Sequence, residues 1–303
     1  MKENVTLTVD INQLTLMRDY YQPYFVNAEG EYIDFQAKIN DIVITAYLSK
    51  KQTKKVTFYG EDAIKEARIW KPDYEPQEKK ESVKESWMFF EDQIGSDEVG
   101  VGDFLGPMIV VAAFVSKYDI KKLREYGIHD SKKMTDKQIL EIGPTLVKEF
   151  HFSKLTLPNE KYNEMLDKGE NLNSMKAKMH NRALLNMHKQ YLDVLNIFVD
   201  QFVQESTYYK YLNDANEEQV KDIIFKTKGE SYFPCVALAS VIARYSYLKE
   251  MEKLSEHYGM VFPFGAGKRV TEFAKEFFNK FGEKELYKVA KKNFANYREV
   301  ISL

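Results

Sequence analysis

The sequence predicts an α/β protein with two parts, a small α+β domain and a larger domain in which helices cover a buried sheet. Its 303 residues are many for one domain, so one large and one small domain are expected. Two apolar runs, residues 108–115 and 194–203, predict buried strands. Helical patterns at residues 172–191 and 236–247 follow these runs, and this alternation is typical of the α/β class.

Composition restricts the class of protein. Apolar residues make up 44% and charged residues 30% of the chain, as in ordinary globular proteins, and no run is apolar enough to span a membrane. The first residues, MKENVTLTVDINQL, lack the apolar core of a signal peptide. A single cysteine, Cys235, excludes an internal disulfide and a cysteine-based zinc cluster, and it fits a reducing cytoplasm. The net charge of −2 does not indicate nucleic-acid binding, so such a role needs local basic patches.

Residues 1–70 predict the small α+β domain. Alternating patterns indicate strands near residues 5–9, 41–48 and 55–59, a hairpin across Gly30, and helices at 14–24 and 62–70. Lysines and aromatic residues on a sheet can hold a nucleic-acid backbone, although a solvated turn is the simpler explanation when this segment is considered alone. The lysines concerned lie in and beside the turn between the last two strands: Lys50, Lys51, Lys54 and Lys55.

Residues 71–90 predict a linker, because they contain two prolines, many charges and little periodicity. The larger domain then occupies residues 91–303. Its patterns predict helices at 120–126, 136–150, 172–191 and 236–247, and a strand at 152–157. His180 falls within the third of these helices, where we expect it to be packed or hydrogen-bonded and not to bind metal.

Two adjacent carboxylates mark the stretch Ile94–Val115, around which the larger domain is organised. Asp97 and Glu98 precede several glycines and a buried strand. Neighbouring side chains of an ideal strand point to opposite faces, so the pair shares a site only near a strand end or a distortion. Glycines allow such a distortion, and buried acids need a cation. Considered alone, the stretch fits a polar hairpin turn equally well.

Two further acids lie where apolar elements end. Asp200 interrupts the run 194–203 late, and strand ends are where α/β proteins place catalytic groups. Glu230 precedes the apolar helix, where by itself it would only complement the charge of the helix N-terminus. Four converging carboxylates repel one another unless divalent cations bind, and oxygen ligands suit Mg²⁺ or Mn²⁺. Two such ions, about 4 Å apart, support phosphodiester hydrolysis.

Five segments together resemble the type 2 ribonucleases H, and most closely the bacterial ribonuclease HIII branch. They occur in the family's order and spacing: DEVGVGDFLGP, HDSKKMTD, FVDQF, KGES and ALASVIARY. The resemblance covers about residues 90–300. It implies an RNase H-like fold, with a central mixed five-stranded sheet flanked by helices, and an N-terminal domain resembling half of the TATA-binding protein. It also implies endonucleolytic cleavage of the RNA strand in RNA–DNA hybrids, which leaves 5′-phosphate and 3′-hydroxyl ends.

The resemblance carries over to single residues. Asp97, Glu98, Asp200 and Glu230 match the family's four acidic ligands of two Mg²⁺ or Mn²⁺ ions. In our interpretation Asp97 bridges both ions, Glu98 and Asp200 complete one shell, and Glu230 holds the other ion and orients the attacking water. Ribonuclease HII has aspartate at the position of Glu230, so this residue favours the HIII branch.

Two further motifs match segments that lie beside the substrate in the family. Gly100, Val101 and Gly102 match the glycine loop that reads the ribose 2′-hydroxyl group through its backbone. Val101 stands where arginine or threonine is usual, so we expect no contact from its side chain to a phosphate. The other motif is the DSKK turn, which provides three of the candidate substrate-binding residues: Ser131, Lys132 and Lys133.

The C-terminal segment predicts additional binding charge. From residue 265 to residue 303, nine lysines and arginines stand against five glutamates. Lys288, Lys291 and Lys292 occur at helical spacing and are candidates for tracking a nucleic-acid strand, although a solvated helix face explains each of them singly. The glycines of FPFGAGKRV precede a helix, and free backbone amides there can take a phosphate.

Alternatives remain at this stage. A non-catalytic nucleic-acid-binding module would explain the lysines but not the four acids. Incision at single ribonucleotides in duplex DNA, as by ribonuclease HII, and a nuclease for branched DNA from the same superfamily are alternatives within enzymes. A small-molecule enzyme lacks support, because the sequence contains no cofactor motif. We expect the protein to be a cytoplasmic monomer that binds RNA–DNA hybrids and does not associate with a membrane.

Overall fold

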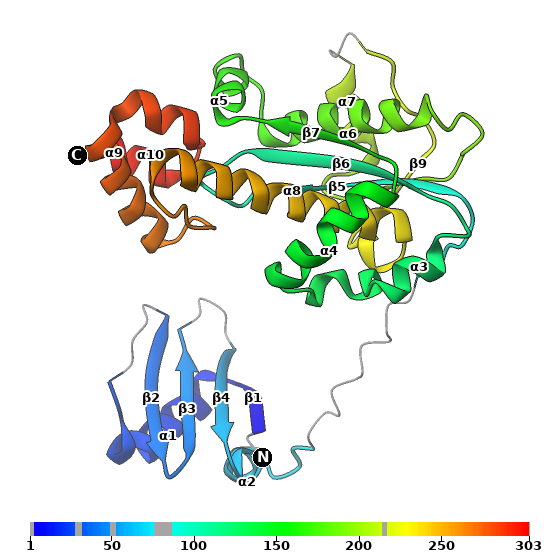
Figure 1. Ribbon diagram of the computed structural model, residues 1–303. Coiled ribbons are helices and arrows are strands. Elements are labelled where there is room, and N and C mark those ends of the chain that lie inside the picture. The colour runs from blue at the N-terminus through cyan, green and yellow to red at the C-terminus, as the bar shows by residue number, and fades with distance from the viewer. Residues whose placement is uncertain (1–2, 28–31, 49–52, 76–86, 214–216, 303) are drawn as a thin grey trace. The chain divides into compact units, whose positions relative to one another are not determined.

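The computed structural model describes residues 3–27, 32–48, 53–75, 87–213 and 217–302. The chain divides into two compact units, Met1–Lys84 and Glu85–Leu303, and each is described by itself (Figure 1). Within the described ranges, no helix combines the length and apolar character needed to cross a membrane.

The first unit is an antiparallel four-stranded sheet with two helices. The order of strands is β1-β4-β3-β2, and alternate residues of β1, Val5, Leu7 and Val9, face the core. The side chain of Asp10 accepts a hydrogen bond from the N–H of Gln13 and so caps the first helix. The elements are β1 (Glu3–Val9), α1 (Ile11–Tyr21), the 3-10 helix η1 (Gln22–Tyr24), β2 (Ile33–Ile39), β3 (Ile42–Tyr47), β4 (Lys54–Gly60) and α2 (Ala63–Trp70).

The hairpin predicted across Gly30 is only partly present in this unit. β2 pairs with β3, and on its other side Phe25 makes a single isolated bridge to Ala37. Gly30 itself lies outside the described residues. The chain before Phe25 is helical through Tyr24, with Pro23 in η1, and it therefore contributes no regular strand.

The second unit contains the mixed five-stranded sheet that the resemblance implied. The order of strands is β7-β6-β5-β8-β9; β5, β6 and β7 are antiparallel neighbours, whereas β8 and β9 run parallel to β5. The strands are β5 (Gln93–Val99), β6 (Met108–Val115), β7 (Phe152–Leu157), β8 (Ile197–Asp200) and β9 (Ile223–Lys226).

Helices cover this sheet and extend beyond one of its ends (Figure 1). They are α3 (Ile120–Glu125), the 3-10 helix η2 (Ile128–Lys133), α4 (Asp136–Glu149), α5 (Asn159–Asp167), α6 (Leu172–His188), α7 (Glu205–Leu212), the 3-10 helix η3 (Gly229–Ser231), α8 (Pro234–Tyr258), α9 (Lys268–Val289) and α10 (Ala295–Ile301). A capping box formed by Thr135 and Gln138 begins α4.

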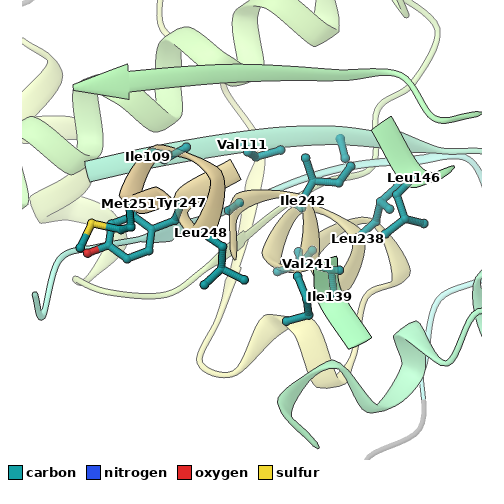
Figure 2. Packing of buried hydrophobic residues seen from close by; sticks show 14 of the residues in the cluster. Ile109, Val111, Ile139, Leu146, Leu238, Val241, Ile242, Tyr247, Leu248 and Met251 are labelled. Carbon is teal, nitrogen blue, oxygen red and sulfur yellow. The ribbon is translucent and has the colours of Figure 1, made fainter. Parts of the chain in front are cut away.

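Both faces of the sheet are buried, which explains why β6 is apolar throughout. Ile109 and Val111 belong to the cluster that α8 and α4 complete, and Figure 2 shows them against the apolar face of α8. Val110 and Ala112 belong to the opposite cluster, with residues of α6 and α7. Alternating residues of one strand therefore meet different helices, as in other sheets covered on both sides.

Two predicted elements of this unit differ clearly in length from the structure. The strand predicted at 194–203 is limited to Ile197–Asp200, and the helix predicted at 236–247 continues to Tyr258. The sequence did not predict β9, because its four residues are too few to show the alternation of apolar and polar residues typical of a strand. Of the predicted linker 71–90, residues 76–86 lie outside the described residues.

Candidate active site

Three of the four candidate acids lie near the carboxyl ends of two neighbouring strands. Asp97 and Glu98 are near the end of β5, and Asp200 is the last residue of β8. β5 and β8 are parallel and hydrogen-bonded, so their carboxyl ends open at the same edge of the sheet. The fourth acid, Glu230, lies in η3 between β9 and α8. This edge is the usual position of sites in α/β proteins.

The two faces of β5 send its adjacent acids toward different helices. On one face, Gly95 allows α8 to come close, because a Cβ atom built there would lie 2.4 Å from the Sγ atom of Cys235. Asp97, two residues on, is 8% exposed and lies beside Ser240 of α8, whose hydroxyl group lowers the pKa of Asp97. On the other face, Glu98 points to α6. Asp97 and Glu98 therefore lie on opposite faces of β5, and both carboxylates are near the sheet edge at which this strand ends.

Helix α6 holds the carboxylate of Glu98 by two side chains one helical turn apart. His180 Nε2 lies 2.9 Å from Glu98 Oε2, and His180 Nδ1 lies 2.8 Å from Ser96 Oγ. Lys176 forms an ion pair with Glu98 Oε1. Burial raises the pKa of Glu98, but His180 and Lys176 outweigh it and leave this pKa below its ordinary value. His180 is thus hydrogen-bonded, as expected.

The short segment that follows β9 brings Glu230 close to Asp200. Asp200 Oδ1 accepts a hydrogen bond of 2.9 Å from the N–H of Gly229, next to Glu230. Glu230 is 5% exposed, and its carboxylate forms an ion pair with Lys132. Lys132 comes from η2, so this contact brings the DSKK turn to the acidic site.

The electrostatics of the site show that the acids are close enough to oppose one another's ionisation. Burial, and then the charges of Glu98 and Asp200, hold the pKa of Asp97 well above its ordinary value. Burial, offset in part by the N–H of Gly229, also raises the pKa of Asp200, and Glu230 and Glu98 raise it further. Negative charge is therefore incompletely compensated at Asp97 and Asp200, and added positive charge would stabilise both carboxylates.

The donor set fits hard divalent cations. All four acids offer carboxylate oxygens, the ligands that Mg²⁺ and Mn²⁺ prefer. Across the described residues, no three His, Cys, Asp or Glu side chains are already arranged to hold one ion. The present counter-charges are protein groups: Lys176 at Glu98 and Lys132 at Glu230. A cation joining these acids would share or replace those ion pairs.

The glycine loop leaves β5 with a backbone that requires glycine at its first position. Gly100 has φ +83°, and a Cβ atom there would lie 2.2 Å from the carbonyl oxygen of Pro107. At Gly102, by contrast, a Cβ atom would meet nothing within 4 Å. Val101 packs against the apolar cluster that includes Met108 and Tyr162. Its side chain is half-buried and contributes to this packing.

A hollow of about 210 Å³ borders the acidic edge. Its lining includes Glu98, Ser131 of the DSKK turn, and Ser240 and Arg244 of α8. Arg244 donates two hydrogen bonds of 2.9 Å to the carboxylate of Asp136. Lys132 and Lys133 are exposed beside this region. The DSKK residues thus lie next to the candidate acids, on a different element.

The structure separates the C-terminal lysines that the sequence grouped together. Lys288 pairs with Glu285 and Lys292 pairs with Asp167. Lys291 is completely buried, so the expectation that it tracks a nucleic-acid strand is wrong. A backbone amide predicted to take phosphate is also occupied, since the N–H of Gly265 donates to Asp103 Oδ1.

The N-terminal lysines are only partly described. Lys50 and Lys51 lie outside the described residues, whereas Lys54 and Lys55 begin β4. Lys55 is exposed, and Lys54 borders a hollow of about 300 Å³ in the first unit.

Three residues that sequence reasoning did not propose belong to the site: Ser96, Lys176 and Ser240 contact Asp97, Glu98 or His180. The spacing of Lys176 and His180, one turn apart on a helix, places the two side chains on one face. The spacing alone does not show which strand this face of the helix packs against.

Comparisons with known proteins agree with this architecture. Residues 94–297 match the ribonuclease HII family, and residues 4–83 match a family described as a domain of unknown function (DUF3378). The chain is similar to ribonuclease HIII of Bacillus anthracis, with 41% identity over 281 residues that cover 89% of this chain and 88% of the relative. Ribonuclease HIII of Bacillus cereus is 40% identical over the same shares.

Solved structures give the same picture. The crystal structure of Bst-RNase HIII in complex with Mn²⁺ is 32% identical and covers 99% of this chain and 98% of its own, with a TM-score of 0.69. Aquifex aeolicus RNase H3 shares the fold at 21% identity and a TM-score of 0.54, covering 95% of this chain and 99% of its own.

Proposed function

Because this chain belongs to the ribonuclease HII family, in its ribonuclease HIII branch, we propose that its four acids catalyse hydrolysis of the RNA strand in RNA–DNA hybrids with two divalent ions. The chain is an endoribonuclease H. The products would carry 5′-phosphate and 3′-hydroxyl ends, and Mg²⁺ or Mn²⁺ would serve as the cofactor. The related Bst-RNase HIII forms a complex with Mn²⁺, which supports a divalent ion at this site.

One observation carries the proposal: two carboxylates at one sheet edge, the buried Asp97 and the half-buried Asp200, have raised pKa values because burial, and then the charges of neighbouring acids, disfavour their ionised forms. Such a cluster is costly unless cations join it. Asp97, Glu98, Asp200 and Glu230 would hold the ions. Bound divalent ions would supply an activated water and stabilise the departing oxygen of the phosphodiester.

The chain's own groups would orient this site. Ser240 of α8 lies beside Asp97, and His180 of α6, itself hydrogen-bonded to Ser96, holds Glu98. The N–H of Gly229 directs Asp200. The backbone of Gly100–Gly102 would contact the ribose 2′-hydroxyl group, and Ser131, Lys132 and Lys133 would bind the substrate beside the acids.

Three labelled duplexes test the proposed function: an RNA–DNA hybrid, a DNA duplex with a single ribonucleotide, and an all-DNA duplex of the same sequence. With Mg²⁺ or Mn²⁺ we expect cleavage of the RNA strand of the hybrid, and with EDTA no cleavage. Efficient incision at the single ribonucleotide would instead indicate the activity of ribonuclease HII. Hybrid binding without cleavage in any metal would leave a binding module and reject the catalytic proposal.

We further propose that the first unit contacts the RNA–DNA hybrid and increases the affinity of the protein for it. Deleting residues 1–84 should weaken hybrid binding and reduce the slope of log K against log [salt], because each lost phosphate contact lowers that slope by about 0.9. Fluorescence anisotropy at several salt concentrations measures both quantities. The same deletion should leave the folding transition of residues 85–303 intact, since the two units are separately compact. Identical affinity and slope would exclude this role.

We also propose that the protein acts as a cytoplasmic monomer. Its single cysteine, Cys235, is buried and free, which agrees with a reducing compartment.

A further inference from the structure

Lys291 is a buried cation that the proposed mechanism does not use. Its side chain is 0% exposed, and its Nζ atom donates to the carbonyl oxygens of Gly106, at 2.6 Å, and Asp103, at 2.8 Å. Burying an ammonium group is costly unless specific acceptors compensate for the lost water. Two carbonyl acceptors at these distances make the contact specific.

The acceptors of Lys291 belong to the loop that connects β5 to β6, residues 100–107. The first part of this loop is the glycine segment Gly100–Gly102, and Asp103 follows directly. Carbonyls 103 and 106 flank the turn of Phe104 and Leu105, so one ammonium group spans the turn. Its position fixes the direction of the peptide group at Asp103.

The backbone around Lys291 reinforces the same loop. The N–H of Lys291 donates to the carbonyl of Phe104 at 2.9 Å, and the N–H of Gly106 donates to the carbonyl of Val289 at 2.9 Å. Leu105 and Ala290 form an antiparallel bridge. The segment of residues 289–291 thus pairs with the loop like a short strand. The side chain of Lys291 adds two further hydrogen bonds, to the carbonyl oxygens of Asp103 and Gly106.

The electrostatic surroundings agree with a structural role for the Lys291 amine that does not depend on its charge. Burial lowers the pKa of Lys291 to about 7, and the charge of Asp103 offsets part of this effect. Both the ammonium and the neutral amine have at least two N–H bonds, so either form can serve both carbonyls. The ring of Tyr162 from α5, with its centroid 5.9 Å from Nζ, covers the group.

We propose that Lys291 is a positioning residue that holds the glycine loop in the conformation that distinguishes ribose from deoxyribose. This inference rests on the proposed function, in which the backbone of Gly100–Gly102 contacts the 2′-hydroxyl group. Without the two side-chain hydrogen bonds, the peptide group at Asp103 can rotate. The adjacent Gly102 does not restrict this rotation, because a residue without a Cβ atom has a wide choice of backbone conformations.

The test compares Lys291→Met with Lys292→Met. The two residues are neighbours, but the ammonium group of Lys292 pairs with Asp167 at the surface, so its replacement removes a lysine side chain without removing a contact to the loop. Anisotropy in EDTA measures the affinity of each variant for the RNA–DNA hybrid and for the all-DNA duplex. We expect Lys291→Met to reduce the hybrid-to-DNA affinity ratio about tenfold, and Lys292→Met to leave it within about twofold.

The outcomes separate the two proposals. A defect that is merely structural would weaken binding of both duplexes equally and leave their ratio unchanged, and that result in Lys291→Met would overturn the positioning role. If Lys291→Met does not fold, Lys291→Gln, a smaller change that stops short of the carbonyls, takes its place with the same expectation. A wild-type chain with no preference for the hybrid would instead contradict the proposed function itself.

Discussion

Replacing Asp97 with asparagine is expected to abolish cleavage of the RNA–DNA hybrid. The proposed role of Asp97 requires a negatively charged oxygen ligand, and asparagine keeps the shape of the side chain but not its charge. Loss of a group that stabilises charge directly in the reaction usually costs 10²–10³-fold in rate, and a ligand shared by two ions should cost about 10³-fold or more. Single-turnover cleavage with Mg²⁺ and with Mn²⁺ measures the loss.

The same substitution should not harm folding in the absence of metal. The raised pKa of Asp97, which arises from burial and the charges of Glu98 and Asp200, means that the native state disfavours its ionised form. Native protein therefore binds more protons than unfolded protein above the ordinary carboxyl pKa, and its stability falls as pH rises through that range. Asparagine removes this loss, so the variant in EDTA at pH 7 should be at least as stable as the wild type.

Asp193→Asn is the matched control for this prediction. Asp193 is an exposed aspartate before β8, and its replacement should change neither cleavage nor stability. Hybrid affinity in EDTA should be retained in both variants. Cleavage by Asp97→Asn at a rate near that of the wild type would remove Asp97 from the proposed catalytic set, whereas an unfolded variant would contradict the electrostatic explanation of its pKa.

Replacing Gly95 with alanine is expected to destabilise the second unit. The added Cβ atom would lie 2.4 Å from Cys235 Sγ and 2.8 Å from the backbone nitrogen of Val236, so the start of α8 must move away from β5. Overpacking of this kind usually costs about 1–3 kcal/mol, a large fraction of the 5–15 kcal/mol by which domains are stable. Urea denaturation measures the change in the free energy of unfolding.

Gly102→Ala controls for the loss of a glycine itself. A Cβ atom at Gly102 has no neighbour within 4 Å, and its backbone does not require a positive φ, so its stability should change by less than about 0.5 kcal/mol. Cleavage by Gly95→Ala should also fall, because α8 carries Ser240 against Asp97. Equal stability of the two variants would show that α8 does not depend on the absence of a side chain at position 95.

The chemical character of the site could be predicted from the sequence because local patterns carry it. Asp97 and Glu98 stand out in an otherwise apolar hairpin, and Asp200 ends an apolar run. The apolar stretch 108–115 predicted a buried strand, and β6 indeed meets different helices on its two faces. These features depend on residue type and on neighbours within a few positions, and a sequence displays both directly.

The contacts between distant segments could not be predicted in the same way. His180 reaches Glu98 across 82 positions of the chain, and only the packing of α6 against β5 brings them together. β9 is four residues long, and its strand conformation depends on pairing with β8. Neither a period nor a propensity of so short a segment determines such a pairing.

Lys291 and Lys292 separate most clearly what the sequence determined from what the fold decided. The sequence by itself determined the class of protein, the acidic residue types at the ends of apolar elements, and a basic C-terminal segment. Only the tertiary structure decided that Lys291 turns inward to two loop carbonyls while Lys292 remains at the surface with Asp167. The helix ends at Val289, so helical periodicity no longer governs these side chains, and the acceptors come from a loop about 185 positions earlier in the chain.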